Sequence, residues 1–165
     1  MKKSLTMLGL LTLLFACDVE EKLTPEQREE IATEIKTEFH NWINSMSESQ
    51  KDFDMSVWVE SDDEAWMGKP AFWFNMMTLY PDQEKIREAW EPIGETRSAT
   101  NFNVEEEYVA VESDDVAVYT FKGSFSITDI DGNTGQDFPM SGSYVYVQRG
   151  DQWKMLHMHQ SWKIE

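Results

Sequence analysis

Between Pro25 and about Ser47, apolar side chains recur every three or four residues, the spacing of one stripe along an α-helix. Thr24 stands at the N-cap position, Pro25 suits the first helical position, and Gln27 can close a capping box with Thr24. The pattern predicts a long amphipathic helix whose stripe must cover another part of the protein. The stripe consists of Ile31, Ile35, Phe39, Trp42, Ile43 and Met46.

The polar residues of this predicted helix fall largely away from the stripe. They include Glu34, Lys36 and Glu38. His40 lies beside the stripe, where a lone histidine is more often a half-buried packing residue than a ligand, so we assign it no role.

The middle of the chain is less regular. Residues 53–63 predict a second, brief helix, and the nonpolar run 66–80, which holds a glycine and a proline, favours a strand with its flanking loop. Apolar residues return to helical spacing over 83–93, so a third helix is expected there.

Beyond Gly94 the pattern changes to alternation of apolar and polar residues, interrupted by turn signals rich in Gly, Asp, Asn and Ser. Helices first and an antiparallel meander afterwards predict one α+β domain, in which a sheet lays one face against helices. The four strands are expected at about 96–112, 116–128, 136–149 and 152–162.

The first residues read as a targeting segment. Lys2 and Lys3 form a basic start, residues 5–15 are apolar, and the run is too short to span a bilayer. The stretch from Leu14 to Cys17 resembles a bacterial lipoprotein signal, in which the cysteine receives the lipid. This implies a signal peptide at 1–16, a lipidated tether at 17–23, a domain at 24–165 and a cell-envelope protein held at the membrane by its lipid anchor alone. Whether it is periplasmic or exposed at the cell surface stays open.

Composition excludes several kinds of function. The chain of 165 residues has 31 acidic and 14 basic residues and a formal charge of −17. Such a charge repels phosphate backbones, so nucleic acid is not an expected partner. Because Cys17 is the single cysteine, an intramolecular disulfide, a redox pair and a cysteine zinc site are all impossible.

Two of the three histidines lie in the last predicted strand. Strict alternation would put His157 and His159 on the same face as Trp153, and Leu156, Met158 and Trp162 on the other. The histidine pair could act as an acid/base pair or could pack as hydrogen-bonded core residues. It could also bind a metal, which ranks lowest because no motif supplies a third ligand, so neither a metal nor another cofactor is expected.

The final strand and the order of elements together resemble the nuclear transport factor 2-like superfamily, in particular its SnoaL-like branch. The resemblance implies a curved sheet wrapped around about three N-terminal helices, the cystatin-like cone, with a pocket at its wide end. Its members include isomerases, cyclases, dehydratases, ligand-binding proteins and oligomerisation modules, so it names no single chemistry. The residues that carry it are Gly150, Trp153, Met155, His157, His159 and Ser161.

Aromatic residues form a second candidate site. They could line a pocket for a flat apolar or aromatic molecule, although rings in so small a domain mostly form the core. The candidate ligand-binding residues are Trp58, Trp73, Trp90, Tyr119, Phe121, Tyr144 and Trp153.

Three functions follow. The first is binding of a small organic molecule without turnover. The second is isomerase, cyclase or dehydratase chemistry with His157 or His159 as general base and a carboxylate partner from among Glu60, Asp62, Asp63 and Asp137. The third is a homodimerising module that uses Leu156, Met158 and Trp162 as an exposed patch.

Two short motifs carry no function. The stretch 129–135 has the one-residue spacing of a calcium loop at its start, but Thr134 and Met140 stand where glycine and the bidentate glutamate are required. It predicts a hairpin turn, and so does the Arg149–Gly150–Asp151 stretch.

Overall fold

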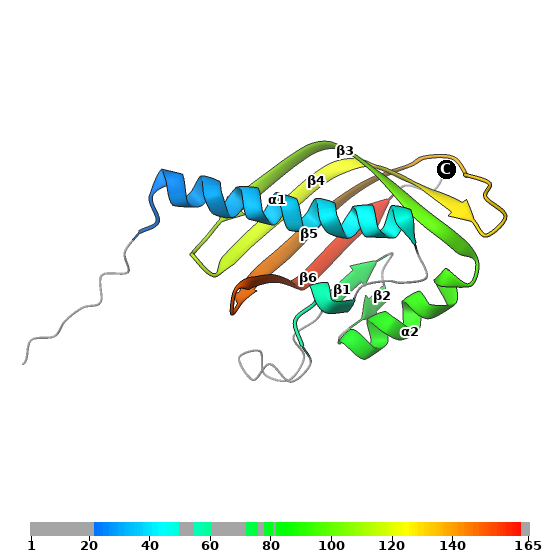
Figure 1. Ribbon diagram of the computed structural model, residues 1–165, viewed down its shortest axis with the longest axis horizontal. Coiled ribbons are helices and arrows are strands. Elements are labelled where there is room, and N and C mark those ends of the chain that lie inside the picture. The colour runs from blue at the N-terminus through cyan, green and yellow to red at the C-terminus, as the bar shows by residue number, and fades with distance from the viewer. Residues whose placement is uncertain (1–21, 50–54, 61–71, 76–77, 81, 163–165) are drawn as a thin grey trace, which may run out of the picture.

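The computed structural model describes residues 22–49, 55–60, 72–75, 78–80 and 82–162 (Figure 1). Cys17 and the predicted signal peptide lie outside the described residues. The described elements are helix α1 (Pro25–Glu48), the 3₁₀ turn η1 (Met55–Val57), strands β1 (Phe72–Asn75) and β2 (Thr78–Tyr80), helix α2 (Gln83–Gly94), and strands β3 (Arg97–Val111), β4 (Val116–Asp129), β5 (Phe138–Arg149) and β6 (Gln152–Trp162).

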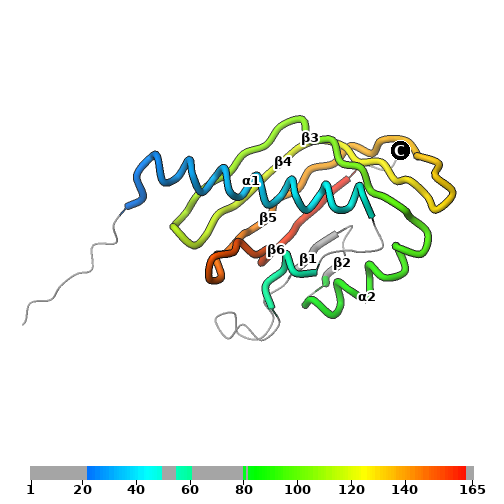
Figure 2. The backbone as a smooth tube through the Cα atoms, viewed as in Figure 1, coloured from blue at the N-terminus to red at the C-terminus, as the bar shows by residue number. Residues whose placement is uncertain are grey.

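The strands form one sheet in the order β2-β1-β6-β5-β4-β3. The long strands β3 to β6 are joined as antiparallel hairpins, whereas β1 pairs with β6 in parallel. Helix α1 runs along one face of this sheet, and α2 lies beyond its β1–β2 end (Figures 1 and 2). The α+β architecture predicted from the hydrophobic pattern is confirmed.

Helix α1 begins as its sequence predicts. The Thr24 hydroxyl accepts a hydrogen bond from the Gln27 backbone, and the Gln27 side chain accepts one from the Thr24 backbone, which completes the capping box. Helix α2 is capped by Asp82, whose carboxylate accepts from the Lys85 backbone at 2.9 Å. Within 55–60, the described part of the predicted second helix, only the three residues of η1 are helical, because the chain then turns into a bridge beside β6. No helix in the described residues is both long and apolar enough to cross a bilayer.

The core is built on Phe39 of α1. Its ring stacks on Tyr119 with centroids 4.2 Å apart and lies 5.1 Å from the rings of both Phe121 and Tyr144. All four residues are almost completely buried. Because β4 and β5 alternate, these rings share the face of the sheet that α1 covers.

Strand β6 contains a bulge that changes its facing. Val145 pairs with His157 while Tyr146 pairs with Met155, so Leu156 is an extra residue between them. Before the bulge Trp153 and Met155 face α1, and after it Met158 and Gln160 take that face. One inserted residue reverses every later side chain. The prediction that His157 and His159 share the Trp153 face is therefore wrong.

The predicted outer patch is wrong for the same reason. Met158 is fully buried in the core, and Trp162 packs against it, with its ring 5.6 Å from that of Phe125. The two predicted turns are confirmed. Gly150 has a φ of +60° between β5 and β6, and the Asp129 carboxylate accepts from the backbones of Asp131 and Asn133 after β4.

Candidate functional site

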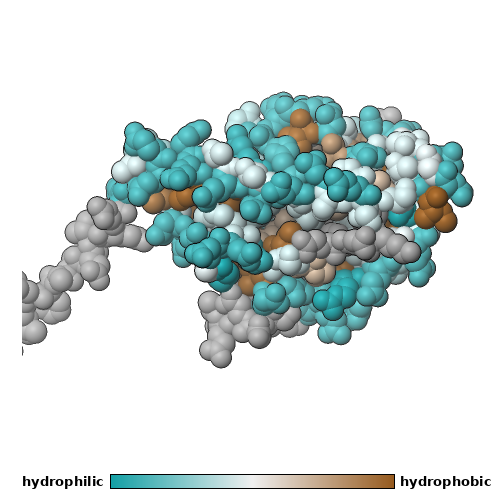
Figure 3. Space-filling model, in the orientation of Figure 1, coloured by the Kyte–Doolittle hydropathy of each residue, from teal (hydrophilic) through white to brown (hydrophobic). Residues whose placement is uncertain are grey.

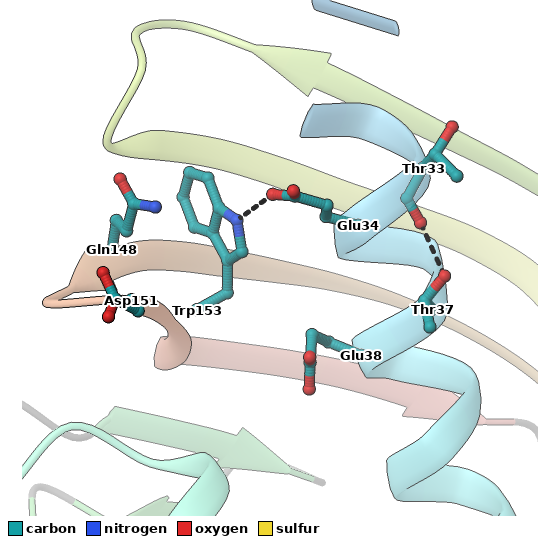
Figure 4. A pocket seen from close by; sticks show the side chains of 7 residues that line it. All are labelled: Thr33, Glu34, Thr37, Glu38, Gln148, Asp151 and Trp153. Carbon is teal, nitrogen blue, oxygen red and sulfur yellow. Dashed lines mark hydrogen bonds between the residues drawn. The ribbon is translucent and has the colours of Figure 1, made fainter. Parts of the chain in front are cut away.

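A hollow of about 400 Å³ lies between α1 and the hairpin of β5 and β6 (Figure 4). One wall is the polar side of the helix, and the other is the end of the hairpin with its turn. The helix wall includes two threonines, and the Thr37 hydroxyl donates a hydrogen bond to the Thr33 carbonyl at 2.8 Å. The lining residues are Thr33, Glu34, Thr37, Glu38, Gln148, Asp151 and Trp153.

Trp153 joins the two walls. Its indole Nε1 donates to a Glu34 carboxylate oxygen at 2.9 Å, and its ring stands between Glu34 and Gln148 (Figure 4). Only 7% of Trp153 is exposed, so the ring presents an edge rather than a full face to the hollow. Along α1 the visible surface is mostly hydrophilic (Figure 3).

Of the aromatic candidates whose side chains the structure describes, only Trp153 lines this hollow. Trp58, Tyr119, Phe121 and Tyr144 are core residues. The buried Gln160 side chain donates to the Tyr144 hydroxyl at 2.6 Å, so that hydroxyl is bonded inside the core. Trp90 is half-buried against the core, and Trp73 lies on β1 with its side chain outside the described residues. Ligand contact by these six stays a prediction.

The two histidines of β6 face away from α1. His157 is half-buried and His159 is exposed, and their cross-strand neighbours are Val145 and Ser143. Burial, and then the charge of His159, lower the pKa of His157. Of their proposed carboxylate partners, Glu60 and Asp137 are exposed and do not line the hollow, while residues 62 and 63 lie outside the described residues. The catalytic role of the histidines stays a prediction.

A cluster of charged and hydrogen-bonded side chains that was not predicted from the sequence lies on the opposite side of α1. The Glu107 carboxylate of β3 accepts from the Tyr119 hydroxyl at 2.8 Å and contacts His40 Nε2 at 2.9 Å, and Lys36 Nζ lies 3.6 Å away. Two features of the amino-acid sequence could have predicted this cluster. Lys36 and His40 lie four residues apart on one side of the helix. Glu107 interrupts the row that Val109 and Val111 continue on the buried face.

The cluster holds Glu107 as a carboxylate. Burial raises its pKa, but the hydrogen bonds from Tyr119 and His40 and the charges of His40 and Lys36 outweigh it, so the pKa of Glu107 lies below its ordinary value. Burial and the bond to Glu107 raise the pKa of Tyr119, which stays a neutral donor. The groups are satisfied by one another, and they tie α1 to the edge of the sheet.

This cluster predicts acid sensitivity. A carboxylate with a lowered pKa stabilises the fold above its unfolded pKa and loses that contribution as pH falls through its folded pKa. Glu107→Gln should therefore lower the free energy of unfolding by about 1–2 kcal/mol at pH 7, and the difference from the unsubstituted protein should shrink below about pH 4.5. Urea unfolding at several pH values measures it. Glu105→Gln, on the exposed side of the same strand, is the control. A constant difference at every pH would contradict the prediction.

Metal binding has no candidate in the described residues. Within them, no group of three His, Cys, Asp or Glu side chains could hold a metal ion.

Comparison with known proteins follows the fold. A model described as a SnoaL-like domain matches residues 35–165. A protein of the NTF2-like family from Streptomyces avermitilis, provisionally assigned as a dehydratase, is 14% identical with a TM-score of 0.70, over 83% of this chain and 99% of that one. The hexachlorocyclohexane dehydrochlorinase of type 3 from Novosphingobium barchaimii is 12% identical with a TM-score of 0.64, over 86% and 92%. The association domain of CaMKII from C. elegans is 11% identical with a TM-score of 0.62, over 82% and 98%. A comparison with curated protein sequences gives no match. At these identities the structural likeness shows the fold alone.

Proposed function

The chain belongs to the SnoaL-like domain family, and from this premise we propose that it is a lipid-anchored binding protein of the cell envelope that holds a small organic molecule between α1 and the β5–β6 hairpin. The hollow of about 400 Å³ carries the proposal. Its volume falls within the range of small-molecule sites, and its walls combine an aromatic edge with polar side chains that can orient a ligand.

The lining changes the kind of ligand that we expect. The aromatic set in the sequence favoured an apolar or aromatic molecule, but most of that set is packed in the core. Six of the seven lining residues are polar or acidic. A molecule that forms hydrogen bonds and covers the edge of Trp153 suits this hollow better than a purely apolar one.

Binding without turnover is favoured over catalysis. The enzymatic alternative requires His157 or His159 as a general base beside the substrate. Here His157 and His159 lie on the far face of the sheet, and His40 contacts Glu107 on the other side of α1. No histidine lines the hollow.

A nuclear magnetic resonance screen tests the proposal. The indole N–H of Trp153 gives a signal that Trp153→Phe removes and so assigns. In a fragment library of mixed charge, compounds that bind should shift this signal. Thr37→Phe, which fills the hollow, should abolish the shift. Asn41→Phe, one turn along the exposed side of the same helix, should retain it. A library without any compound that shifts the Trp153 signal would contradict the proposal.

The lipid anchor rests on Cys17 and the apolar segment before it. The full chain should incorporate a labelled fatty acid and partition into detergent, and Cys17→Ala should remain in the aqueous phase. Detergent partition unchanged by Cys17→Ala would exclude this cysteine as the anchor.

A second candidate function is homodimerisation through the outer face of β4, β5 and β6. The central rows of this face are Val118, Val145 and His157, then Thr120, Ser143 and His159, then Lys122, Ser141 and Ser161. None of these nine is acidic, in a chain with 31 acidic residues. Since two strongly anionic copies repel elsewhere, a face without carboxylates is where they can approach. The likeness to an association domain agrees with this.

Analytical ultracentrifugation, which measures the oligomeric state, tests whether the protein forms this dimer. The protein should sediment as a dimer at neutral pH, and Ser143→Glu should give a monomer because two added carboxylates would meet at the interface. Ser98→Glu, on the exposed part of β3, should leave the dimer intact. A monomer at high concentration would remove the candidate.

A further inference from the structure

The hollow contains two carboxylates that nothing in the described residues neutralises. Of its three acidic residues, Glu34 accepts from the Trp153 indole. Glu38 and Asp151 have no hydrogen bond or ion pair within the described part of the chain. The remaining polar lining groups include the two threonine hydroxyls, which already donate to helix carbonyls and keep lone pairs to accept with. Among the described side chains that line the hollow, only the Gln148 amide still has hydrogens to donate, so the hollow is rich in acceptors and poor in donors.

The neighbouring basic residues face elsewhere. Lys36 turns to Glu107 on the opposite side of α1, at 3.6 Å. Lys154 follows Trp153 on β6, so it points to the other face, where its ammonium donates to the Ser56 carbonyl at 2.6 Å. Arg149 follows Gln148 on β5 and is likewise on the other face. Among the described residues that line the hollow there is no Lys, Arg or His, so a ligand is the expected source of positive charge there.

A buried polar atom lies one row deeper. The Tyr146 hydroxyl has no hydrogen-bond partner among the described residues, and the residue is only 2% exposed. Tyr146 shares the inward face of β5 with Gln148, and the two pair with Met155 and Trp153 of β6. Burial, then Tyr144, and then the charge of Glu38 raise the pKa of this hydroxyl. Such an unsatisfied group costs free energy. Tyr146 does not itself line the hollow, so only a molecule that extended past Gln148 would recover that cost.

We propose that the hollow selects a small organic cation, a primary amine whose ammonium lies between Glu38 and Asp151 and whose body packs against the edge of Trp153. This rests on the proposed function and adds the class of ligand. An ammonium supplies three hydrogen-bond donors and one positive charge. These match the lining acceptors that lack a donor and the negative charge of the lining. Carboxylates that do not converge on one metal ion can still surround a larger organic cation.

Three compounds of similar shape but different charge test the proposed class of ligand. They are 2-phenylethylamine, 2-phenylethanol and phenylacetate, titrated into the mature protein with the Trp153 indole signal as readout. The amine should bind at least tenfold more tightly than the alcohol, and phenylacetate should bind more weakly than either. Of the affinities of the amine and the alcohol, added salt should lower only that of the amine.

A charge-matched pair of variants locates the cation. Glu38→Gln with Asp151→Asn should lower amine affinity at least tenfold and leave the alcohol unchanged. Glu30→Gln with Asp114→Asn removes the same charge from exposed positions outside the hollow and should stay within twofold of the parent. Amine affinity that falls equally in both double variants would overturn the site, because only the net charge would then matter.

The remaining outcomes separate the two proposals. Equal binding of all three compounds at Trp153 overturns the cationic class and leaves small-molecule binding standing. Absence of any response at Trp153, from these compounds and from the mixed library, overturns both.

Discussion

Replacing Phe39 by alanine should lower the free energy of unfolding by about 3–5 kcal/mol. The ring is fully buried, and it contacts Tyr119, Phe121 and Tyr144 at centroid distances of 4.2, 5.1 and 5.1 Å. Alanine would leave a cavity where α1 meets β4 and β5, and the surrounding rings cannot close it without leaving their own contacts. For a domain of this size the melting temperature should fall by about 8–16 °C.

Thermal and urea unfolding measure this effect. Asn41→Ala, two residues along the exposed side of the same helix, should stay within about 0.5 kcal/mol of the parent. Phe39→Leu should lie between the two, because it restores part of the buried volume. A loss below about 1 kcal/mol for Phe39→Ala would mean that α1 does not pack on the sheet through this ring.

Local patterns were sufficient to predict most elements of this fold. The apolar stripe and capping box specify α1, and turn residues at 129–135 and at Gly150 delimit the hairpins. Each of these signals acts over a few residues, so it survives in the sequence without knowledge of the tertiary structure. The one long element assigned to the wrong faces is the second half of β6.

That error has a definite physical cause. A bulge is fixed by how a strand pairs with its neighbours, and nothing in "MLHM" marks Leu156 as the extra residue. Both possible alternations offer apolar side chains to the core, Met155 in one and Met158 in the other. The structure uses both, and it turns His157 and His159 outward as a result.

The candidate site was hidden for a different reason. Two of its three acidic residues, Glu34 and Glu38, lie on α1 away from the stripe, where charged residues are ordinarily solvated. The two sides of α1 differ in the charged residues that the neighbouring strands place opposite them. Toward β3, Glu107 is matched by Lys36 and His40. Toward β5 and β6, the described residues that line the hollow with Glu34 and Glu38 include Asp151 and no basic residue. Only the three-dimensional arrangement reveals that one flank of α1 is neutralised and the other is not.

Gly123→Ala should be the most damaging change of a single methyl group. A Cβ at this position would lie 2.0 Å from the Asn103 carbonyl oxygen, 3.0 Å from its carbon and 3.2 Å from the Val104 Cα. These are backbone atoms of the paired strand, so no change of rotamer relieves the clash, and β3 would have to move away from β4. The displacement falls beside the register shift between Val104 and Glu106.

The expected loss is about 3 kcal/mol in the free energy of unfolding, measured by urea denaturation. Gly135→Ala is the matched control, since its nearest neighbour would be the Ile127 carbonyl oxygen at an ordinary 3.6 Å, and it should change stability by less than about 0.5 kcal/mol. Because Glu107 follows the register shift on β3, the movement should also separate it from His40. Gly123→Ala should then lose the acid sensitivity that Glu107 confers, whereas Gly135→Ala should keep it. Equal stability of the two variants would show that β3 and β4 are not in close contact at Gly123.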